Sequence, residues 1–106
     1  MIVVKLTALY KQPEDQKAFD EHYFQTHLPL AGKMPGLVKV EVTKFTGTPL
    51  GTKSPYYLQA DMYFENEKAL DEAMKSPEGK AAAKDVMSFA GKLVTMIVGE
   101  VHSEKG

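Results

Sequence analysis

The chain has 106 residues and a mass of 11.7 kDa, so we expect a single domain over residues 1–106. Apolar residues make up 43% of it and charged residues 25%, as in folded globular proteins, which excludes a disordered chain. With no cysteine, it lacks disulfides, thiolate metal sites and cysteine nucleophiles. A net charge of −1 and the absence of arginine argue against a nucleic-acid partner.

The sequence shows neither a transmembrane nor an export signal. No apolar run reaches the length of a membrane-spanning helix, and the N-terminus lacks the three-part pattern of a signal peptide. We therefore expect a soluble, cytoplasmic protein with no membrane contact.

The N-terminal third predicts a strand followed by a helix. Residues 2–10 alternate between apolar and mixed positions, which is typical of a strand. A helix is predicted from Pro13 to about Thr26, because proline and acidic residues favour a first turn. Pro29 disfavours helical geometry at Leu28 and is expected to end that helix.

Two further strands are predicted around a long loop. Residues 37–45 and 56–64 both alternate in polarity. The loop between them, residues 46–55, is rich in Gly, Pro, Thr and Ser and longer than a usual hairpin turn. We expect it to be a mobile flap that borders a cavity.

The C-terminal part predicts two helices and a last strand. Asn66 is a good cap for a first helix, and Ser76 with the proline after it begins a second, which ends at Gly91. Residues 93–101 form the last predicted strand, and the chain from Ser103 onward is expected to be a frayed tail.

This order, β-α-β-β-α-β, predicts an α+β protein of the ferredoxin-like class. Right-handed crossovers place both helices on one face of a four-stranded antiparallel sheet. The strand at 93–101 is apolar on both sides, although a sheet with one face in water should alternate. We therefore predict a homodimer in which two sheets cover each other, forming a dimeric α+β barrel.

Several polar side chains lie at the alternate strand positions that point to the sheet face which the second copy would cover. Tyr57, Asp61 and Tyr63 are the candidates for lining a ligand cavity inside the barrel. The alternative is that the charged residues of this face are solvated rim groups that form ion pairs between subunits.

Two of the three histidines lie in one segment of the first helix, on either side of a tyrosine. With about 100° per residue, Phe19 and Tyr23 form its buried stripe, and His22 and His27 flank that stripe about 140° apart. Imidazole titrates near neutral pH and suits acid–base chemistry, with Tyr23 as a second donor. The alternative is that His22 forms a surface hydrogen bond and His27 stabilises the helix C-terminus.

Metal binding is not expected, because a spacing of five differs from the i, i+4 spacing of paired zinc-binding histidines. Asp85 is a further group of interest, since an acid near a helix C-terminus opposes the helix dipole. It is a solvated charge, a partner of Lys84 or Lys92, or a residue that orients a histidine.

The sequence resembles the EthD family, named for a protein linked to ethyl tert-butyl ether degradation. The resemblance rests on the His-Tyr and Thr-His-Leu-Pro-Leu signature within residues 19–30 and covers nearly the whole chain. It extends to residues 35–37, 76–79, Asp85, Val86 and Phe89. The family resemblance implies a dimeric α+β barrel. Related barrels include cofactor-independent monooxygenases, lactone isomerases and polyketide-modifying dehydratases.

We therefore expect a small enzyme for degradation or secondary metabolism, acting on a hydrophobic, oxygen-bearing compound in the barrel cavity. His27 is its expected acid–base residue, and His22 and Tyr23 are expected to position the reacting groups or to donate a proton. No motif indicates an organic cofactor, and oxidation, isomerisation and dehydration all remain open. The alternatives are a binding or accessory protein without catalysis, and a haem-binding barrel. A cavity reached by both histidines favours catalysis; one reached by neither favours a carrier.

Two other classes share this order of elements. RNA-binding domains are set aside because residues 56–64 lack their basic and aromatic strand pattern, and copper chaperones because they need cysteine.

Overall fold

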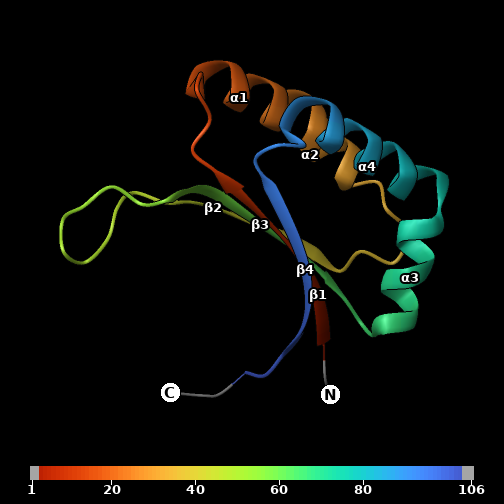
Figure 1. Ribbon diagram of the computed structural model, residues 1–106. Coiled ribbons are helices and arrows are strands. Elements are labelled where there is room, and N and C mark those ends of the chain that lie inside the picture. The colour runs from red at the N-terminus through yellow and green to blue at the C-terminus, as the bar shows by residue number, and fades with distance from the viewer. Residues whose placement is uncertain (1–2, 104–106) are drawn as a thin grey trace.

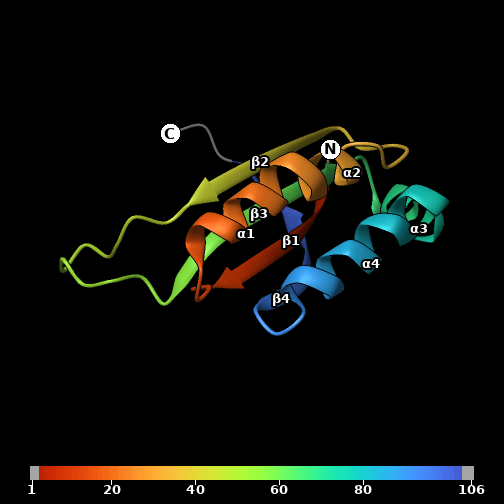
Figure 2. The ribbon, with the colours of Figure 1, turned by 90° about the horizontal axis from the view of Figure 1, so that it is seen from above.

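The computed structural model describes residues 3–103 and confirms the ferredoxin-like fold. Its elements are β1 (Val3–Lys11), α1 (Gln16–His22), η1 (Tyr23–His27), α2 (Leu28–Ala31), β2 (Lys39–Lys44), β3 (Tyr56–Phe64), α3 (Glu67–Lys75), α4 (Pro77–Ala90) and β4 (Val94–Val101). The strands form one antiparallel sheet in the order β2-β3-β1-β4, and all helices lie on one face (Figures 1 and 2). The predicted strand start at Ile2 and the tail at 104–106 lie outside the described residues.

The core lies between the sheet and the helices. The two central strands bury every second residue on that side, as their alternation predicted: Val4, Leu6, Ala8 and Tyr10 from β1, and Leu58, Ala60, Met62 and Phe64 from β3. These positions pair directly across the two strands, so each apolar residue meets another on the same face.

The opposite face of the sheet carries no helix (Figure 1). On the edge strand β4, Ile97 is 57% exposed on this open face, while its neighbour Val98, cross-strand from Leu6, is 55% exposed on the helix side. In this single chain β4 is therefore poorly covered on both faces, which fits its predicted two-sided apolar character.

The first helical region continues through Pro29, so the predicted helix end there is wrong. α1 begins after Asp15, whose side chain accepts a 3.0 Å hydrogen bond from the Ala18 N–H. The helix passes without a break into η1, a π-helical segment, and then into α2, which ends at Ala31. In η1 the backbone hydrogen bonds already join residues five apart instead of four. Pro29, which has no N–H to donate, comes directly after this irregular turn, and the helix continues past it.

The caps of the two C-terminal helices are confirmed. Asn66 accepts from the Ala69 N–H at 2.8 Å and Ser76 accepts from the Gly79 N–H at 3.0 Å. Gly79 is buried at the corner between α3 and α4, where a Cβ atom would lie 2.0 Å from the Ala73 carbonyl oxygen. Only glycine allows these two helices to approach so closely.

One strand irregularity changes the direction of a predicted site residue. β1 and β3 pair Tyr10 with Leu58 but Lys11 with Tyr56, so Tyr57 is an extra residue at a bulge. Its side chain is buried against α1 with its ring 5.6 Å from that of Phe19, and not on the open face as the alternation predicted.

Candidate functional site

The carboxylate of Asp85 contacts both histidines of the first helical region. His22 Nε2 lies 2.9 Å from Asp85 Oδ1 and 3.0 Å from Oδ2, and His27 Nδ1 lies 3.0 Å from Oδ2. This confirms one of the three interpretations of Asp85, that it orients a histidine. An ionised carboxylate only accepts hydrogen bonds, so Nδ1 of His27 carries a proton and Nε2 of the neutral ring is an acceptor.

The π-helical segment explains how histidines five residues apart reach one carboxylate. On an α-helix their rings would point about 140° apart. In η1 the Leu28 N–H bonds to the Tyr23 carbonyl, five residues earlier, so residues five apart lie above one another. The predicted divergence of His22 and His27 is therefore wrong. Their shared contact follows from an irregularity that an ideal helical wheel omits.

Helix α4 supplies both the carboxylate and a ring for the histidines to pack on. Asp85 and Phe89 are four residues apart and lie on one face of α4. The Phe89 ring centroid is 4.3 Å from that of His22 and 5.4 Å from that of His27. Each imidazole is thus held by a hydrogen bond at one nitrogen and by an aromatic surface.

A cavity of about 30 Å³, large enough for a water molecule, lies between the sheet and the helices. Its lining is apolar except for three groups, Tyr10, Tyr23 and His27. The remaining lining residues are Leu6, Ala8, Leu28, Ala31, Met34, Val40, Ala60, Met62, Met74, Gly79, Ala82, Ala83, Val86 and Met96. The cavity that His27 reaches is therefore in the core of one chain, whereas the sequence predicted it between two sheets. Residues of the 46–55 loop do not line this inner cavity, and their place beside a barrel cavity stays a prediction.

Burial sets the protonation of the cavity groups. Desolvation lowers the pKa of His27 below its ordinary value, although the hydrogen bond and the charge of Asp85 act in the opposite direction. Desolvation also raises the pKa of Tyr10 and of Tyr23. At neutral pH the cavity therefore presents a neutral imidazole and two protonated phenols. His27 is not a helix-terminal imidazolium, because the helix continues to Ala31.

His22 lies closer to the molecular surface than His27. Its side chain is 36% exposed, against 9% for His27, and it lines an open groove on the outside of the molecule together with Phe89. Of the two histidines only His27 lines the inner cavity, and the two are linked by their shared contact with Asp85.

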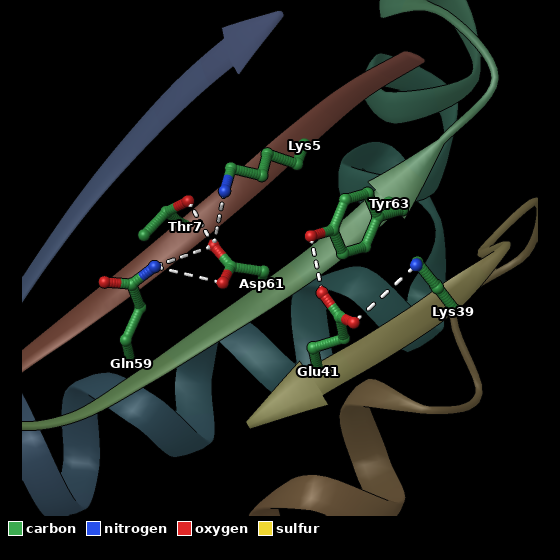
Figure 3. Close-up of polar contacts among 7 residues, drawn as sticks. All are labelled: Lys5, Thr7, Lys39, Glu41, Gln59, Asp61 and Tyr63. Carbon is green, nitrogen blue, oxygen red and sulfur yellow. Dashed lines mark hydrogen bonds and ion pairs between the residues drawn. The ribbon is translucent and has the colours of Figure 1, made fainter. Parts of the chain in front are cut away.

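The open face of the sheet carries a separate polar network (Figure 3). Asp61 accepts hydrogen bonds from Thr7 at 2.7 Å and from Gln59 at 3.0 Å, and pairs with Lys5 at 3.2 Å. Burial alone would raise the pKa of the Asp61 carboxyl, but these partners outweigh it and hold the pKa below the usual value.

Beside this network, Tyr63 donates to Glu41 at 2.6 Å, and Lys39 lies 3.6 Å from the same carboxylate (Figure 3). The hydrogen bond to Glu41 raises the pKa of Tyr63 to about 12. Thus Asp61 and Tyr63 occupy the open face, away from the cavity that His27 lines, and their contact with a ligand stays a prediction for a barrel interior.

The third predicted ligand contact, Tyr57, lies apart from the other two. Its hydroxyl donates to Asp20 Oδ1 at 2.8 Å, and Lys44 lies 2.9 Å from Asp20 Oδ2. Tyr57 therefore joins α1 to the end of the sheet and faces neither the inner cavity nor Asp61.

Two groups of this site were not among the predicted site residues. Asp85 was noted only as a charge at an unfavourable helix position. That position, with Phe89 one turn later on the same helix face, was the sequence feature that pointed to its contact with the histidines. Tyr10 was counted as an ordinary strand residue, because alternation gives its face but not whether its hydroxyl finds a partner.

Residues 3–103 hold no group of three or more His, Cys, Asp or Glu side chains placed to bind a metal ion. Within the same range, no helix has the length and apolar character needed to cross a membrane.

Comparison with known proteins finds matches along nearly all of the chain. The EthD domain model matches residues 11–92. The crystal structure of an EthD family protein from Bacillus halodurans C-125 is 53% identical with a TM-score of 0.92, covering 94% of this chain and 99% of that one. An uncharacterized 11.0 kDa protein from the thcB-thcC intergenic region of Rhodococcus erythropolis is 39% identical, covering 88% of this chain and 89% of its own length.

More distant structures show the fold alone. A hydroxynitrile lyase from Passiflora edulis is 14% identical with a TM-score of 0.73, covering 98% of this chain and 97% of that one. A dimeric protein of ferredoxin-like fold from Bacteroides fragilis is 19% identical with a TM-score of 0.61, covering 93% of this chain and 96% of that one.

Proposed function

This chain belongs to the EthD domain family, and we propose that it is an enzyme that moves a proton on a small, apolar, oxygen-bearing molecule held in the inner cavity. His27 is the acid–base residue, Asp85 fixes its ring, and His22 holds Asp85 from the solvent side. The observation that carries the proposal is the 3.0 Å contact between His27 Nδ1 and Asp85 in a side chain that also lines the cavity.

This geometry suits a general base. Asp85 fixes the tautomer that leaves Nε2 of His27 as an acceptor, and burial keeps the ring neutral at pH 7. A base of this kind takes a proton from a bound molecule and becomes an imidazolium, which the Asp85 carboxylate stabilises. Tyr23, with its ring centroid 5.6 Å from that of His27, lines the same cavity as a protonated phenol.

The proposal needs no cofactor, because the proton donor and acceptor groups are side chains of the chain itself. The Passiflora hydroxynitrile lyase has a similar fold at 14% identity, which supports the view that this fold accommodates small-molecule enzymes. Its reaction is not transferred to this chain.

We also propose that two copies pair through their open sheet faces. The open face of β4 is apolar at Ile97 and uncovered, and a dimeric protein from Bacteroides fragilis shares the fold. Pairing would shield Ile97 and the Asp61 network together, while the inner cavity of each chain stays on the helix side of its own sheet.

The function is tested by deuterium exchange. Small neutral ketones are incubated with the protein in D₂O, and loss of the hydrogens next to the carbonyl is followed by NMR. The wild-type protein should accelerate exchange, and His27→Gln should reduce this acceleration by about 10²–10⁴-fold with little change in melting temperature. If ketones bind to the wild type but their hydrogens do not exchange, the proposed catalysis is contradicted and the protein is a carrier.

A further inference from the structure

The hydroxyl of Tyr10 is the one buried side-chain polar atom without a hydrogen-bond partner among residues 3–103. Tyr10 is fully buried and lines the inner cavity. A buried hydroxyl with no partner loses its hydration without compensation, so such groups are rare in folded proteins. Tyr10 belongs to the wall of the cavity that His27 also lines, so a molecule bound there can supply the missing acceptor.

The ring of Tyr10 is fixed, so its hydroxyl cannot turn away to find another partner. It packs edge-on against Phe19 at 5.3 Å and Tyr23 at 5.7 Å, and stacks on Phe89 at 6.5 Å. The rings of Tyr23 and Phe89, which the Tyr10 ring contacts, also contact the His27 ring, so Tyr10 lies on the side of the cavity that holds this histidine. Tyr10 therefore offers a preorganised O–H donor near the base.

The cavity lining also limits the charge of its ligand. No lysine, aspartate or glutamate is among the residues that line the cavity, and His27 is neutral. A carboxylate or an ammonium group would enter without a counter-charge, so its loss of hydration would not be compensated. The complementary ligand is neutral, with one oxygen that accepts from Tyr10 and one acidic hydrogen near His27.

We propose that the cavity binds a neutral carbonyl compound with a removable hydrogen beside its carbonyl group, and that Tyr10 donates its O–H to the carbonyl oxygen. In the reaction the C–H bond breaks and its proton goes to His27 Nε2. The electron pair forms a C=C bond while the C=O pair moves onto the oxygen, where Tyr10 stabilises the enolate. Return of the proton to carbon completes an exchange or an isomerisation without an oxidant. This reaction rests on the proposed function; the binding role of Tyr10 does not.

Methionine side chains give the cavity room to adapt. Met34, Met62, Met74 and Met96 line it, and these unbranched side chains change rotamer readily. Met96 is 38% exposed on the edge strand β4, so it lies where the cavity meets the surface. A ligand larger than the present 30 Å³ enters by displacing these side chains.

The test measures the binding of three probes by calorimetry: p-cresol, which is a neutral mimic of an enol, toluene, which lacks the oxygen, and 4-hydroxybenzoate, which adds a negative charge. The wild type should bind p-cresol most tightly and 4-hydroxybenzoate most weakly. Tyr10→Phe removes only the hydroxyl and should weaken p-cresol binding about fivefold while leaving toluene binding unchanged. Its melting temperature should stay equal or rise, since no hydrogen bond is lost from the free protein.

Tyr56→Phe, which makes the same deletion outside the cavity, is the control and should bind all three probes as the wild type does. The inference is overturned if Tyr10→Phe binds p-cresol normally, if its melting temperature falls, if 4-hydroxybenzoate binds as well as p-cresol, or if millimolar p-cresol does not bind to the wild type. If the three probes bind as predicted but no ketone exchange is seen, the proposed function is wrong and Tyr10 is only a hydrogen-bond donor to a bound ligand.

Discussion

Each side of the sheet has one partly or fully buried carboxylate, Asp61 on the open face and Asp85 of α4 on the helix side, and their surroundings differ. On the open face Asp61 is surrounded by Thr7, Gln59 and Lys5, none of which carries an imidazole. On the helix side Asp85 is held by two imidazoles, the side-chain type suited to acid–base chemistry near neutral pH. The Asp61 network therefore fits a structural role, whereas the Asp85 cluster contains the proposed proton acceptor.

The contrast extends to the neighbouring phenols. Tyr63 on the open face has its acceptor, Glu41, at 2.6 Å, so its hydrogen bond is complete within the chain. Tyr10 on the helix side has none. A buried hydroxyl whose hydrogen bonds are satisfied within the chain indicates a structural role, whereas an unsatisfied one beside a cavity indicates a bound ligand. Chemistry is therefore expected on the helix side.

The largest expected effect separates the two carboxylates. Asp85→Asn should reduce ketone exchange by about 10²–10⁴-fold, because an amide cannot hold His27 in the tautomer that leaves Nε2 basic. Asp61→Asn should leave exchange unchanged but lower the free energy of unfolding by about 1–3 kcal/mol, since Lys5 loses its counter-charge and the Gln59 amide would face another N–H donor. Urea unfolding and NMR exchange measure both variants, and slow exchange in Asp61→Asn would show that the open face contacts the ligand.

The second prediction tests whether a partner covers the open face. If the proposed dimer forms, Ile97→Lys should convert it to monomers of 11.7 kDa in light scattering at micromolar concentration, because an unpaired charge would be buried in the interface. Val98→Lys is the matched control, with nearly equal exposure on the other face of the same strand, and should stay dimeric. A wild-type protein that is monomeric at this concentration would contradict the pairing.

Acid should destabilise the helix side before the open face. The pKa of His27 is lower in the folded chain than in the unfolded chain, so the unfolded state binds more protons below about pH 6.5. Stability is therefore complete above that pH and is lost as pH falls toward the folded pKa of His27. The Asp61 contribution, with a lowered carboxyl pKa, persists until pH falls below about 3.9.

Thermal unfolding between pH 7 and 5 checks this order. His27→Gln should show a shallower decline than the wild type, while Asp61→Asn, although less stable throughout, should keep the wild-type slope. Equal slopes in all three proteins would mean that His27 is not buried in its neutral form.

The smallest expected effect is local to the open face. Glu41→Gln should lower the pKa of Tyr63 from about 12 toward its ordinary value near 10, because the carboxylate that favours the protonated phenol is gone. NMR titration of the tyrosine rings measures this shift, and ketone exchange should not change. An unchanged Tyr63 titration would show that the Glu41 contact is not maintained in solution.

Most of the fold was predictable because it follows from local patterns. Alternation gave the faces of β1 and β3, and side-chain caps gave the starts of α3 and α4. The failures lie where the backbone leaves its regular period. A bulge turned Tyr57 to the helix side, and η1 brought His22 and His27 into line.

The site was predictable only in part for a second reason. His22 and Asp85 are 63 residues apart, so their contact depends on how α4 crosses η1, and no spacing along the chain encodes this. The histidines and Tyr23 stood out by residue type, whereas the location of the cavity depended on packing between the sheet and the helices.

The π-helical segment makes the histidine pair depend on chain length as well as on residue type. At the present length an α-helical segment would turn the two rings about 140° apart, whereas removing one residue, such as Gln25, would place the histidines four apart on a regular α-helix, about 40° from each other. The π-helical turn therefore absorbs one extra residue and keeps both histidines on the face that contacts Asp85. A related chain that lacks this residue would show the two histidines at a spacing of four, and a one-residue gap in an alignment here is compatible with an intact pair.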